Sequence, residues 1–568
     1  MLGAQSTIIK AQPNAKALGF ITTPISIVRF LTRWAVRTPG ARVLDAGLGD
    51  GRFLAEAARR LIALGATQEQ AAQQLYGVEL DPVLFQQAVE RVSLETGREV
   101  SNLYSGNFLD CPSWRVESVI GNPPYVRRHH IQEIDRWLHA LPGRLPRMTD
   151  LSALFVYKAT QLLVPGGRLA VIMSSGWLDQ AYGREFRAYL LEHYSDVTVV
   201  GFGDRVFPDA LVKPIALLGL RRVDAHSKTQ VHVTTYQNEA GVPSEVETEI
   251  LNSARDLDPE EFSSQINLSS QLYLPEAHPI LASHGLAYSQ LGQIAALRIG
   301  FQSFSKGFFL LERQDLCRLG LSSDDVRPIV LSPRFLPDSL LLRPEDVTGR
   351  VFWAKTLEDL SLSARWYLMS AESQEVPVRG KGFAVRGYQN APRAMRTSRS
   401  PWFNVATELQ RRGGAPILLP RRTFVRFRVV HNPAEIPATE HFLEIRPNDS
   451  DLVTPLLVYL NSTFGELATR LASHQYGGGV FNLNPGQARK IALPDLTRLA
   501  RCNTTLEITW TAVRNTSARS ARASLDDAVV EALEIPADSL SAARHLVTVI
   551  RDTAERFAHP RAEKEFSL

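Results

Sequence analysis

Residues 41–51 read Ala-Arg-Val-Leu-Asp-Ala-Gly-Leu-Gly-Asp-Gly, and Arg-Phe-Leu-Ala-Glu-Ala-Ala-Arg-Arg-Leu follows at 52–61. This pattern predicts a short buried strand, a glycine-rich turn and an amphipathic helix. A second strand is predicted over Leu-Tyr-Gly-Val-Glu, which ends at Glu79. In doubly wound nucleotide-binding sheets, a carboxylate at the end of the second strand binds ribose hydroxyls. The stretch therefore predicts an α/β fold with a cofactor site at the carboxyl edge of its sheet.

The glycine turn carries carboxylates and no phosphate-binding group. Its glycines, Gly47, Gly49 and Gly51, are spaced G-x-G-x-G, whereas a dinucleotide site needs the third glycine one residue later. Such a turn alone is weak evidence for any cofactor. With Asp45 and Glu79 beside it, the turn indicates a cofactor that carries a cation, and S-adenosylmethionine fits. We expect Asp45 and its loop to face the amino group and the sulfonium, and Glu79 to bind the ribose.

Two neighbouring segments extend the predicted cofactor site. Leu80, together with Phe108 in the stretch Ser-Gly-Asn-Phe-Leu-Asp, is a candidate apolar wall for the adenine. Upstream, Gly-Phe-Ile-Thr-Thr-Pro at 19–24 precedes an amphipathic helix. Thr22 or Thr23 is therefore expected to cap that helix and to face the methionine moiety of the cofactor. A helix cap without any cofactor contact is the alternative.

The chemistry is indicated by Gly-Asn-Pro-Pro-Tyr at 121–125, directly after the apolar run Ser-Val-Ile. An exocyclic amine on a nucleobase is a poor nucleophile, because its lone pair is delocalised into the ring. The amide oxygen of Asn122 and the carbonyl of Pro123 can accept both amine hydrogens and make that nitrogen more nucleophilic. Pro123 and Pro124 stiffen the loop, and Tyr125 offers a face on which an extruded base stacks. An ordinary Asn-Pro turn at a strand end is the alternative interpretation.

The order of these motifs resembles that of the gamma-type adenine-N6 DNA methyltransferases, the TaqI-like and Eco57I-like enzymes of restriction–modification or phage-defence systems. Residues 150–173 resemble the helix and strand that follow the catalytic loop in that family, and residues 206–218 resemble its later hairpin. The resemblance implies that Tyr125 and Phe207 sandwich the flipped base, while the Asn122 loop holds its amine.

One position departs from the family pattern. Where this chain has Asn107, the family often has an aspartate. In the family, that aspartate accepts a hydrogen bond from the adenine amine of the cofactor. An asparagine oxygen can accept the same bond without a charge. Asn107 and Asn122 are therefore included among the expected cofactor contacts.

The composition bounds the class of protein. A chain of 568 residues is too long for one hydrophobic core, so about two or three domains are expected. Apolar residues make up 44% and charged residues 21%, and neither a membrane-spanning run nor a secretory signal stands out. The cysteines Cys111, Cys317 and Cys502 are far apart, which fits a reducing cytoplasm and no zinc site. We expect a cytoplasmic protein with no metal and no membrane partner.

The second half of the chain interleaves arginines with aromatic residues, most densely over 420–430. A strand there would place four alternate side chains, of which three are arginines, on one face that suits DNA phosphates. A solvated strand face is the alternative. A triple glycine further on would allow close approach to a DNA backbone. The candidate DNA-binding residues are Arg422, Arg426, Arg428, Gly477, Gly478 and Gly479.

These observations and the resemblance combine into one hypothesis about architecture and partners. Residues 1–250 are expected to form a doubly wound class I S-adenosylmethionine-dependent methyltransferase domain, residues 285–500 a mixed α/β DNA target-recognition domain, and residues 501–568 a helical region. The expected substrate is double-stranded DNA. A cognate restriction endonuclease or defence-system proteins are possible further partners of the chain, which is expected to be a monomer.

The hypothesis for function is a sequence-specific methyltransferase that moves a methyl group from S-adenosylmethionine to the N6 amine of a flipped adenine. Cytosine-N4 methyltransferases use the same type of acceptor loop. A Ser at position 122 would indicate cytosine, whereas the Asn that this chain has there favours adenine. A glutamine methyltransferase also uses an Asn-Pro-Pro-Tyr loop, but such enzymes are much shorter. A catalytically inactive DNA-binding modification subunit is the alternative from a different class.

Overall fold

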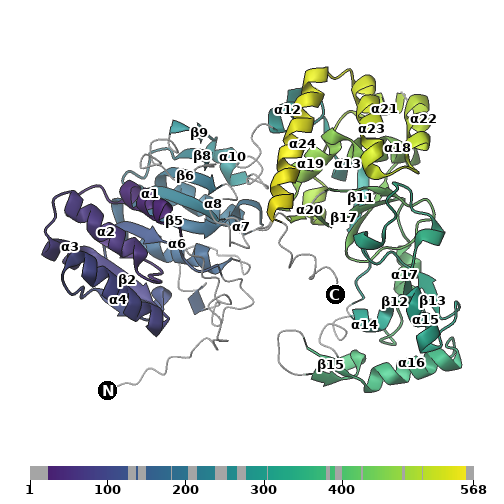
Figure 1. Ribbon diagram of the computed structural model, residues 1–568, viewed down its shortest axis with the longest axis horizontal. Helices are drawn as coiled ribbons and strands as arrows, with labels where there is room; N and C mark the ends of the chain where they lie inside the picture. The colour runs from purple at the N-terminus through teal and green to yellow at the C-terminus, as the bar shows by residue number, and fades with distance from the viewer. Residues whose placement is uncertain are drawn as a thin grey trace. The chain divides into compact units, whose positions relative to one another are not determined.

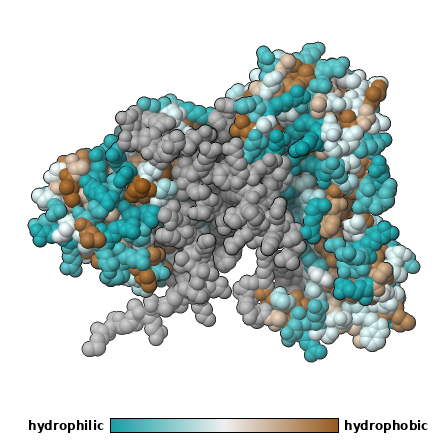
Figure 2. Space-filling view, viewed as in Figure 1, coloured by the Kyte–Doolittle hydropathy of each residue, from teal (hydrophilic) through white to brown (hydrophobic). Residues whose placement is uncertain are grey.

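The computed structural model describes most of the chain, in two compact units that divide at residue 275 (Figure 1). The described residues are 23–125, 136–137, 149–180, 182–202, 214–236, 252–264, 277–283, 285–303, 305–378, 384–390, 399–423, 426–475, 480–501 and 503–557. None of the helices in these ranges combines the length and the apolar character that a bilayer crossing requires. Hydrophilic residues dominate the face drawn in Figure 2, with hydrophobic residues scattered among them.

The first unit is built on a nine-stranded sheet with the strand order β3-β2-β1-β4-β5-β7-β6-β8-β9. The strands are β1 Val43–Asp45, β2 Leu75–Glu79, β3 Leu103–Ser105, β4 Val116–Gly121, β5 Leu163–Ser174, β6 Tyr194–Phe202, β7 Pro214–Arg221, β8 Gln230–Tyr236 and β9 Arg255–Asp256. Strands β1 to β5 run parallel, whereas β7 runs antiparallel to both β5 and β6. The carboxyl ends of β1, β2 and β4 therefore lie at the same edge of the sheet.

Helices cover both faces of this sheet, as the alternation of buried strand residues requires. Leu44, Val119 and Val171 point into one core, and their neighbours along each strand point into the other. One face is covered by α1 Ile25–Ala35, α2 Arg52–Ala63, α3 Gln68–Gln74 and α4 Pro82–Thr96, and the other by α6 Leu151–Leu162, α7 Gly176–Asp179, α8 Gly183–His193 and α10 Pro259–Ser264. The predicted doubly wound fold is confirmed.

The local predictions around the glycine turn are also confirmed. The strand, turn, helix and second strand are β1, residues 46–51, α2 and β2. The segment Pro-Gly-Gly at 165–167 lies within β5, where pairing with β4 jumps from Leu163 to Arg168. Gly166 has φ +77° in this unpaired segment, so the chain makes its irregular step there.

Two glycines allow the site edge to be closely packed. Gly51, with φ +79°, precedes α2, and a β-carbon on it would lie 2.8 Å from Cα of Ala88 in α4. Gly121, with φ +139°, ends β4, and a β-carbon on it would lie 2.5 Å from the Asp45 carboxylate. Both positions therefore require glycine for their backbone conformation as well as for space.

The second unit contains several small antiparallel sheets. A four-stranded sheet has the order β11-β20-β17-β19, and two three-stranded sheets have the orders β12-β14-β13 and β18-β22-β21. Their strands are β11 Ala295–Ile299, β12 Leu310–Glu312, β13 Val326–Pro328, β14 Gly349–Phe352, β17 Ile417–Pro420, β18 Arg422–Thr423, β19 Val430–His431, β20 Phe442–Pro447, β21 His474–Gln475 and β22 Phe481–Asn482. Two further pairs join β10 Ser289–Gln290 to β23 Ala492–Leu493 and β15 Glu375–Pro377 to β16 Ala384–Arg386.

Helices complete the second unit, so its predicted mixed α/β architecture is confirmed. Its helices are α12 Ala277–Ser283, α13 Leu291–Ile294, α14 Lys306–Phe309, α15 Arg313–Leu319, α16 Leu362–Ser373, α17 Ala406–Arg412, α18 Val453–Asn461, α19 Thr463–Ala472, α20 Pro485–Ala488, α21 Leu496–Arg501, α22 Asn503–Val513, α23 Ala518–Leu533 and α24 Ala537–Phe557. The predicted helical C-terminal region corresponds to α22–α24, drawn in yellow tones in Figure 1, where α23 packs on α18 and α24 on α19.

Buried charges join the C-terminal helices to α19. The carboxylate of Asp526 in α23 accepts hydrogen bonds from the backbone N–H and the hydroxyl of Thr463. Glu466, also buried, pairs with Arg470 one turn later at 2.7 Å and with Arg522 of α23. Because buried charges must be paired, these contacts make the C-terminal helices part of the core of the second unit.

The prediction of one continuous strand over 420–430 is wrong. Apart from Pro420, which ends β17, only Arg422–Thr423 and Val430–His431 are strands in the described part of this segment. The hydroxyl of Thr423 accepts a bond from the N–H of Arg426 and donates one to its carbonyl, which makes the chain turn. At Val429, the backbone N–H donates to Oδ1 of Asn461, and the backbone carbonyl accepts from Nδ2 of Asn461. These two bonds take the place of pairing with a neighbouring strand.

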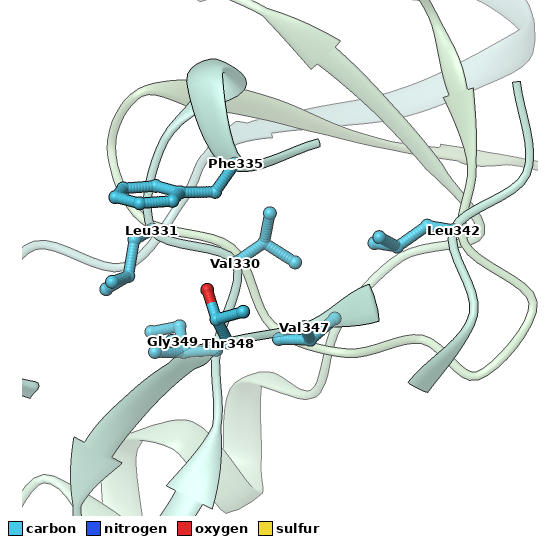
Figure 3. A pocket seen from close by; sticks show the side chains of 8 residues that line it. Val330, Leu331, Phe335, Leu342, Val347, Thr348 and Gly349 are labelled. Carbon is cyan, nitrogen blue, oxygen red and sulfur yellow. The ribbon is translucent and has the colours of Figure 1, made fainter. Parts of the chain in front are cut away.

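The small cavity in Figure 3 belongs to the apolar packing of the second unit. Val330, Leu331, Phe335 and Leu342 line it together with Val347 and the backbone around Gly349. Its volume of about 10 Å³ leaves room for one water molecule at most. The cavity is therefore a packing defect between strands and carries no ligand site.

The close contact at Gly121 generates a stability prediction. We expect Gly121→Ala to destabilise the first unit by roughly 2–5 kcal/mol, because the substitution adds backbone strain and a clash with Asp45. Gly40→Ala is the matched control, since a β-carbon there meets nothing within 4 Å. Urea denaturation of both variants measures the difference, and equal stabilities would show that β4 and β1 are not packed as described.

Candidate active site

The candidate site lies where the turns after β1, β2 and β4 meet at one edge of the sheet. The glycine turn after β1 is held to β2 by the N–H of Leu48, which donates to the carbonyl of Val78 at 3.0 Å. A β-carbon on Gly47 would lie 3.7 Å from Cα of Pro123, so the glycine turn touches the loop after β4. The structure thus brings together the two motifs that the sequence analysis identified separately.

Asp45 provides a buried carboxylate at the base of the glycine turn. Its Oδ1 accepts a bond from the N–H of Gly47 at 3.2 Å, and its Oδ2 is buried without a hydrogen-bond partner among the described residues. Burial, reinforced by the charges of Glu79 and Asp50, raises the pKa of Asp45 to about 8. An unpartnered buried carboxylate oxygen is unfavourable by itself. The site therefore fits a ligand that carries a cationic group.

Glu79 ends β2 with its carboxylate held by backbone donors. Gly49 and Asp81 donate their N–H groups to its two oxygens at 2.8 and 2.9 Å. Burial raises its pKa. Each carboxylate oxygen can accept a further hydrogen bond, so this arrangement suits a ligand with hydroxyl groups, such as a ribose.

The residues expected to contact the adenine of the cofactor differ in exposure. Leu80 is 53% exposed and offers an open apolar surface beside Glu79. Phe108 is only 2% exposed and packs against Phe155, with ring centroids 4.9 Å apart. Asn107 precedes Phe108, and its Oδ1 accepts a bond from the N–H of Leu109 at 3.0 Å. Of the two predicted adenine walls, only Leu80 has an open face in this structure.

The loop after β4 holds the amide of Asn122 between two hydroxyl groups. Its Nδ2 donates to Oγ1 of Thr23 at 3.1 Å, and its Oδ1 accepts from the hydroxyl of Tyr125 at 2.6 Å. Burial and the charge of Asp150 raise the pKa of Tyr125 well above its usual value, so this hydroxyl stays protonated and acts as a donor. The acceptor oxygen proposed for catalysis thus lies at the site edge in a defined orientation.

Thr23 does not have the capping role that was predicted for it. The residue before α1 is Pro24, no side chain within the described ranges caps the helix, and the carbonyl of Pro24 accepts from the N–H of Ile27. The expectation fails because Thr23 lies one residue too early and its hydroxyl accepts from Asn122. The other threonine of the pair, Thr22, lies outside the described residues.

Asp150 is a site-edge residue that the sequence analysis missed. It caps α6 through the N–H of Ala153 and also accepts bonds from the hydroxyls of Ser174 and Tyr182. These contacts join the end of β5 to the starts of α6 and α8. The signal was present, since an aspartate directly before an apolar helix is a common N-cap.

The residues predicted to bind DNA or to stack on the base are only partly described. Phe207, Gly477, Gly478 and Gly479 lie outside the described residues. Arg422 is exposed, and its Nε donates to Asn482 at 3.2 Å.

Arg426 and Arg428 are not the open phosphate ligands that strand alternation predicted. Arg426 donates to the carbonyl of Ala518 and lies 4.0 Å from the Glu466 carboxylate, and Arg428 pairs with Asp338 at 3.5 Å. Burial lowers the pKa of Arg426 to about 10. Both side chains therefore contribute to packing within the second unit.

The class I methyltransferase fold is defined by a sheet in which the antiparallel strand β7 lies between β5 and β6, with an acidic glycine turn beside an acceptor loop. Two family models extend this assignment to the chain as a whole. Residues 8–263 match the N-6 DNA Methylase family, and residues 280–530 match the C-terminal domain of the type II methyltransferase M.Eco57I. Together the two models cover most of the chain, so its two units are similar to an N-6 DNA methylase and to the C-terminal domain of an Eco57I-like type II DNA methyltransferase.

Individual relatives agree with this family. The type II methyltransferase M.AccI of Acinetobacter calcoaceticus is 22% identical over 510 residues, which are 84% of this chain and 85% of that protein. M.XamI of Xanthomonas campestris pv. amaranthicola is 29% identical over 195 residues, or 33% of this chain and 35% of that protein. The type IIL restriction-modification enzyme MmeI, solved with DNA, has a similar fold, with a TM-score of 0.53 and 13% identity over 94% of this chain and 75% of that chain.

The raised pKa of Asp45 generates a prediction about cofactor binding. At pH 6 the carboxyl is mostly protonated, and a cationic ligand group favours the ionised form. We therefore expect the affinity for S-adenosylmethionine to increase as the pH rises towards about 8, by up to about tenfold per pH unit. Binding near pH 7 should release a proton, which calorimetry in two buffers of different ionisation enthalpy measures.

Asp45→Asn is the control for this experiment, because it keeps the shape of the side chain but cannot ionise. The variant should bind more weakly and lose the part of the pH dependence that Asp45 contributes. Identical pH profiles for the wild type and the variant would contradict a role for the Asp45 carboxylate in holding the cation.

Proposed function

We propose that this protein is a sequence-specific DNA methyltransferase that transfers a methyl group from S-adenosylmethionine to the N6 amine of an adenine rotated out of duplex DNA. The observation that carries the proposal is the oriented amide of Asn122, which directly follows β4 and lies next to the glycine turn. The match of residues 8–263 to the N-6 DNA Methylase family and the similarity of the second unit to an Eco57I-like methyltransferase support the choice of an amine as acceptor.

The chain activates the amine by accepting a hydrogen bond from each of its two N–H groups. Oδ1 of Asn122 and the carbonyl oxygen of Pro123 bind one hydrogen each, which localises the lone pair on the nitrogen and makes it nucleophilic. Bound S-adenosylmethionine supplies an electrophilic methyl group on a sulfonium. Tyr125 stacks on the extruded base, and the two prolines hold the acceptors still. Most of the acceleration then comes from positioning, and no side chain forms a covalent bond to the substrate.

The cofactor would be held by the residues of the glycine turn and the end of β2. The unpartnered Oδ2 of Asp45 fits the amino group, and the remaining lone pairs of Glu79 fit the ribose hydroxyls. The exposed side chain of Leu80 offers a surface for the adenine. Asn107, shortly after β3, is a second contact of the adenine in this proposal, whereas the role expected for Phe108 stays a prediction because its ring is buried against Phe155.

We assign DNA recognition to the second unit, which matches the C-terminal domain of M.Eco57I over residues 280–530. Sequence-independent binding needs exposed cations, and Arg422 is one. A cognate restriction endonuclease as partner, a monomeric state and a cytoplasmic location stay predictions from the sequence.

Single-molecule sequencing of DNA from a methylation-deficient host that expresses the protein tests the proposed function. We expect N6-methyladenine within one sequence motif, and Asn122→Ala should reduce this modification by at least about 10²-fold while S-adenosylmethionine still binds. Asn102→Ala is the control, because Asn102 is a surface residue whose amide donates only to the Gln73 carbonyl at 2.9 Å among the contacts described.

Three results of this experiment would contradict the proposal. N4-methylcytosine in the mapped motif would show that the target base is cytosine and not adenine. DNA without modified bases would favour an inactive DNA-binding subunit. Normal methylation by Asn122→Ala would remove the amine-acceptor role of the amide.

Two of the four arginines of the 420–430 segment, Arg422 and Arg426, differ in environment and allow a test of DNA binding. We expect Arg422→Gln to lower DNA affinity and to reduce the slope of log K against log salt by about one, because an exposed phosphate contact is lost. Arg426→Gln should leave this slope unchanged, since its guanidinium faces Ala518 and Glu466. Fluorescence anisotropy at several salt concentrations measures both slopes, and the opposite ranking would assign the phosphate contact to Arg426 instead of Arg422.

A further inference from the structure

The amide of Asn122 must have its oxygen, and not its nitrogen, directed at the base for the proposed chemistry to occur. Rotation by about 180° about χ2 exchanges the two atoms with little change in shape, and this torsion is soft in asparagine. A rotated amide would point donors at an amine that also donates. The reaction therefore requires something that restricts this rotation.

Thr23 is placed to restrict it. Nδ2 of Asn122 donates to Oγ1 of Thr23 at 3.1 Å, and this bond leaves Oδ1 on the opposite side, where the Tyr125 hydroxyl donates to it. Thr23 is only 2% exposed, so its hydroxyl is shielded from competition by water. Because a carbonyl oxygen has two lone pairs, Oδ1 retains capacity for the amine hydrogen.

The backbone of Thr23 is itself fixed to the glycine turn. Nη1 of Arg52 donates to the carbonyl of Thr23 at 2.8 Å. The same guanidinium binds Asp50 through two bonds of 2.9 and 2.7 Å, and Arg91 of α4 binds Asp50 as well, at 2.9 Å. A continuous set of contacts thus runs from α4 through the glycine turn to Thr23 and on to Asn122.

We propose that Thr23 is a positioning residue of the methyl transfer, which holds the Asn122 amide with its oxygen towards the target amine. This role rests on the proposed function, since it acts only through Asn122. This role differs from the helix cap and from the methionine contact that the sequence suggested, because here the Thr23 hydroxyl acts on the Asn122 amide.

Thr23→Val tests the inference, since it keeps the shape of the side chain and removes the acceptor. We expect single-turnover methyl transfer at saturating S-adenosylmethionine to be about 10- to 100-fold slower, because the amide is no longer held in the productive orientation. The dissociation constant of S-adenosylmethionine from calorimetry should stay within about twofold of the wild-type value. The fluorescence of 2-aminopurine at the target position should also be unchanged, since neither extrusion nor stacking of the base uses Thr23.

Two further variants separate positioning from a general loss of structure. Thr23→Ser retains the hydroxyl and should recover most of the wild-type rate. Thr32→Val is the matched control, because Thr32 is fully buried in α1 and its hydroxyl has no hydrogen-bond partner. We expect this variant to transfer methyl groups at the wild-type rate.

The possible failures can be told apart. Wild-type turnover by Thr23→Val overturns the inference and leaves the proposed function intact. Weaker cofactor binding with a normal rate at saturation assigns Thr23 to the cofactor and also overturns it. A wild-type protein that methylates no base amine overturns the proposed function and this inference together.

Discussion

The site depends on one amide side chain, Asn122, which is held between the hydroxyls of Thr23 and Tyr125 at the end of a buried strand. Each neighbour of this amide comes from a different part of the first unit. Strand β4 delivers Asn122, residues before α1 deliver Thr23, and the glycine turn supports both. The packing of Gly121 against Asp45 fixes the distance between β4 and β1, so a change in the sheet would also move the acceptor.

Charge is used differently in the two units. In the first unit, the buried Asp45 and the half-buried Glu79 lie at the edge of the sheet and have raised pKa values, which suits the cation and the hydroxyl groups of the proposed cofactor. In the second unit, several arginines serve the interior. Glu466 alone pairs with Arg470 and Arg522 and lies near Arg426. The number of arginines in the sequence therefore overstates the cationic surface that is available to DNA.

Much of the first unit could be predicted because its signals are local. The strand, glycine turn and helix over 43–63 and the strand that ends at Glu79 follow from short-range periodicity, and the loop after β4 follows from its two prolines. The contacts of Thr23 and Asp150 could not be predicted, because they join residues far apart in the chain. Alternation also failed over 420–430, where side chains of Thr423 and Asn461 bind the backbone and prevent a strand.

A crystal structure of the protein with duplex DNA and an unreactive analogue of S-adenosylmethionine tests the central claim most directly. The account predicts an everted adenine whose N6 lies about 2.7–3.2 Å from both Oδ1 of Asn122 and the carbonyl oxygen of Pro123. A bound complex in which the extruded base turns its amine away from these two oxygens, or in which Asn122 presents its nitrogen to the base, would contradict it.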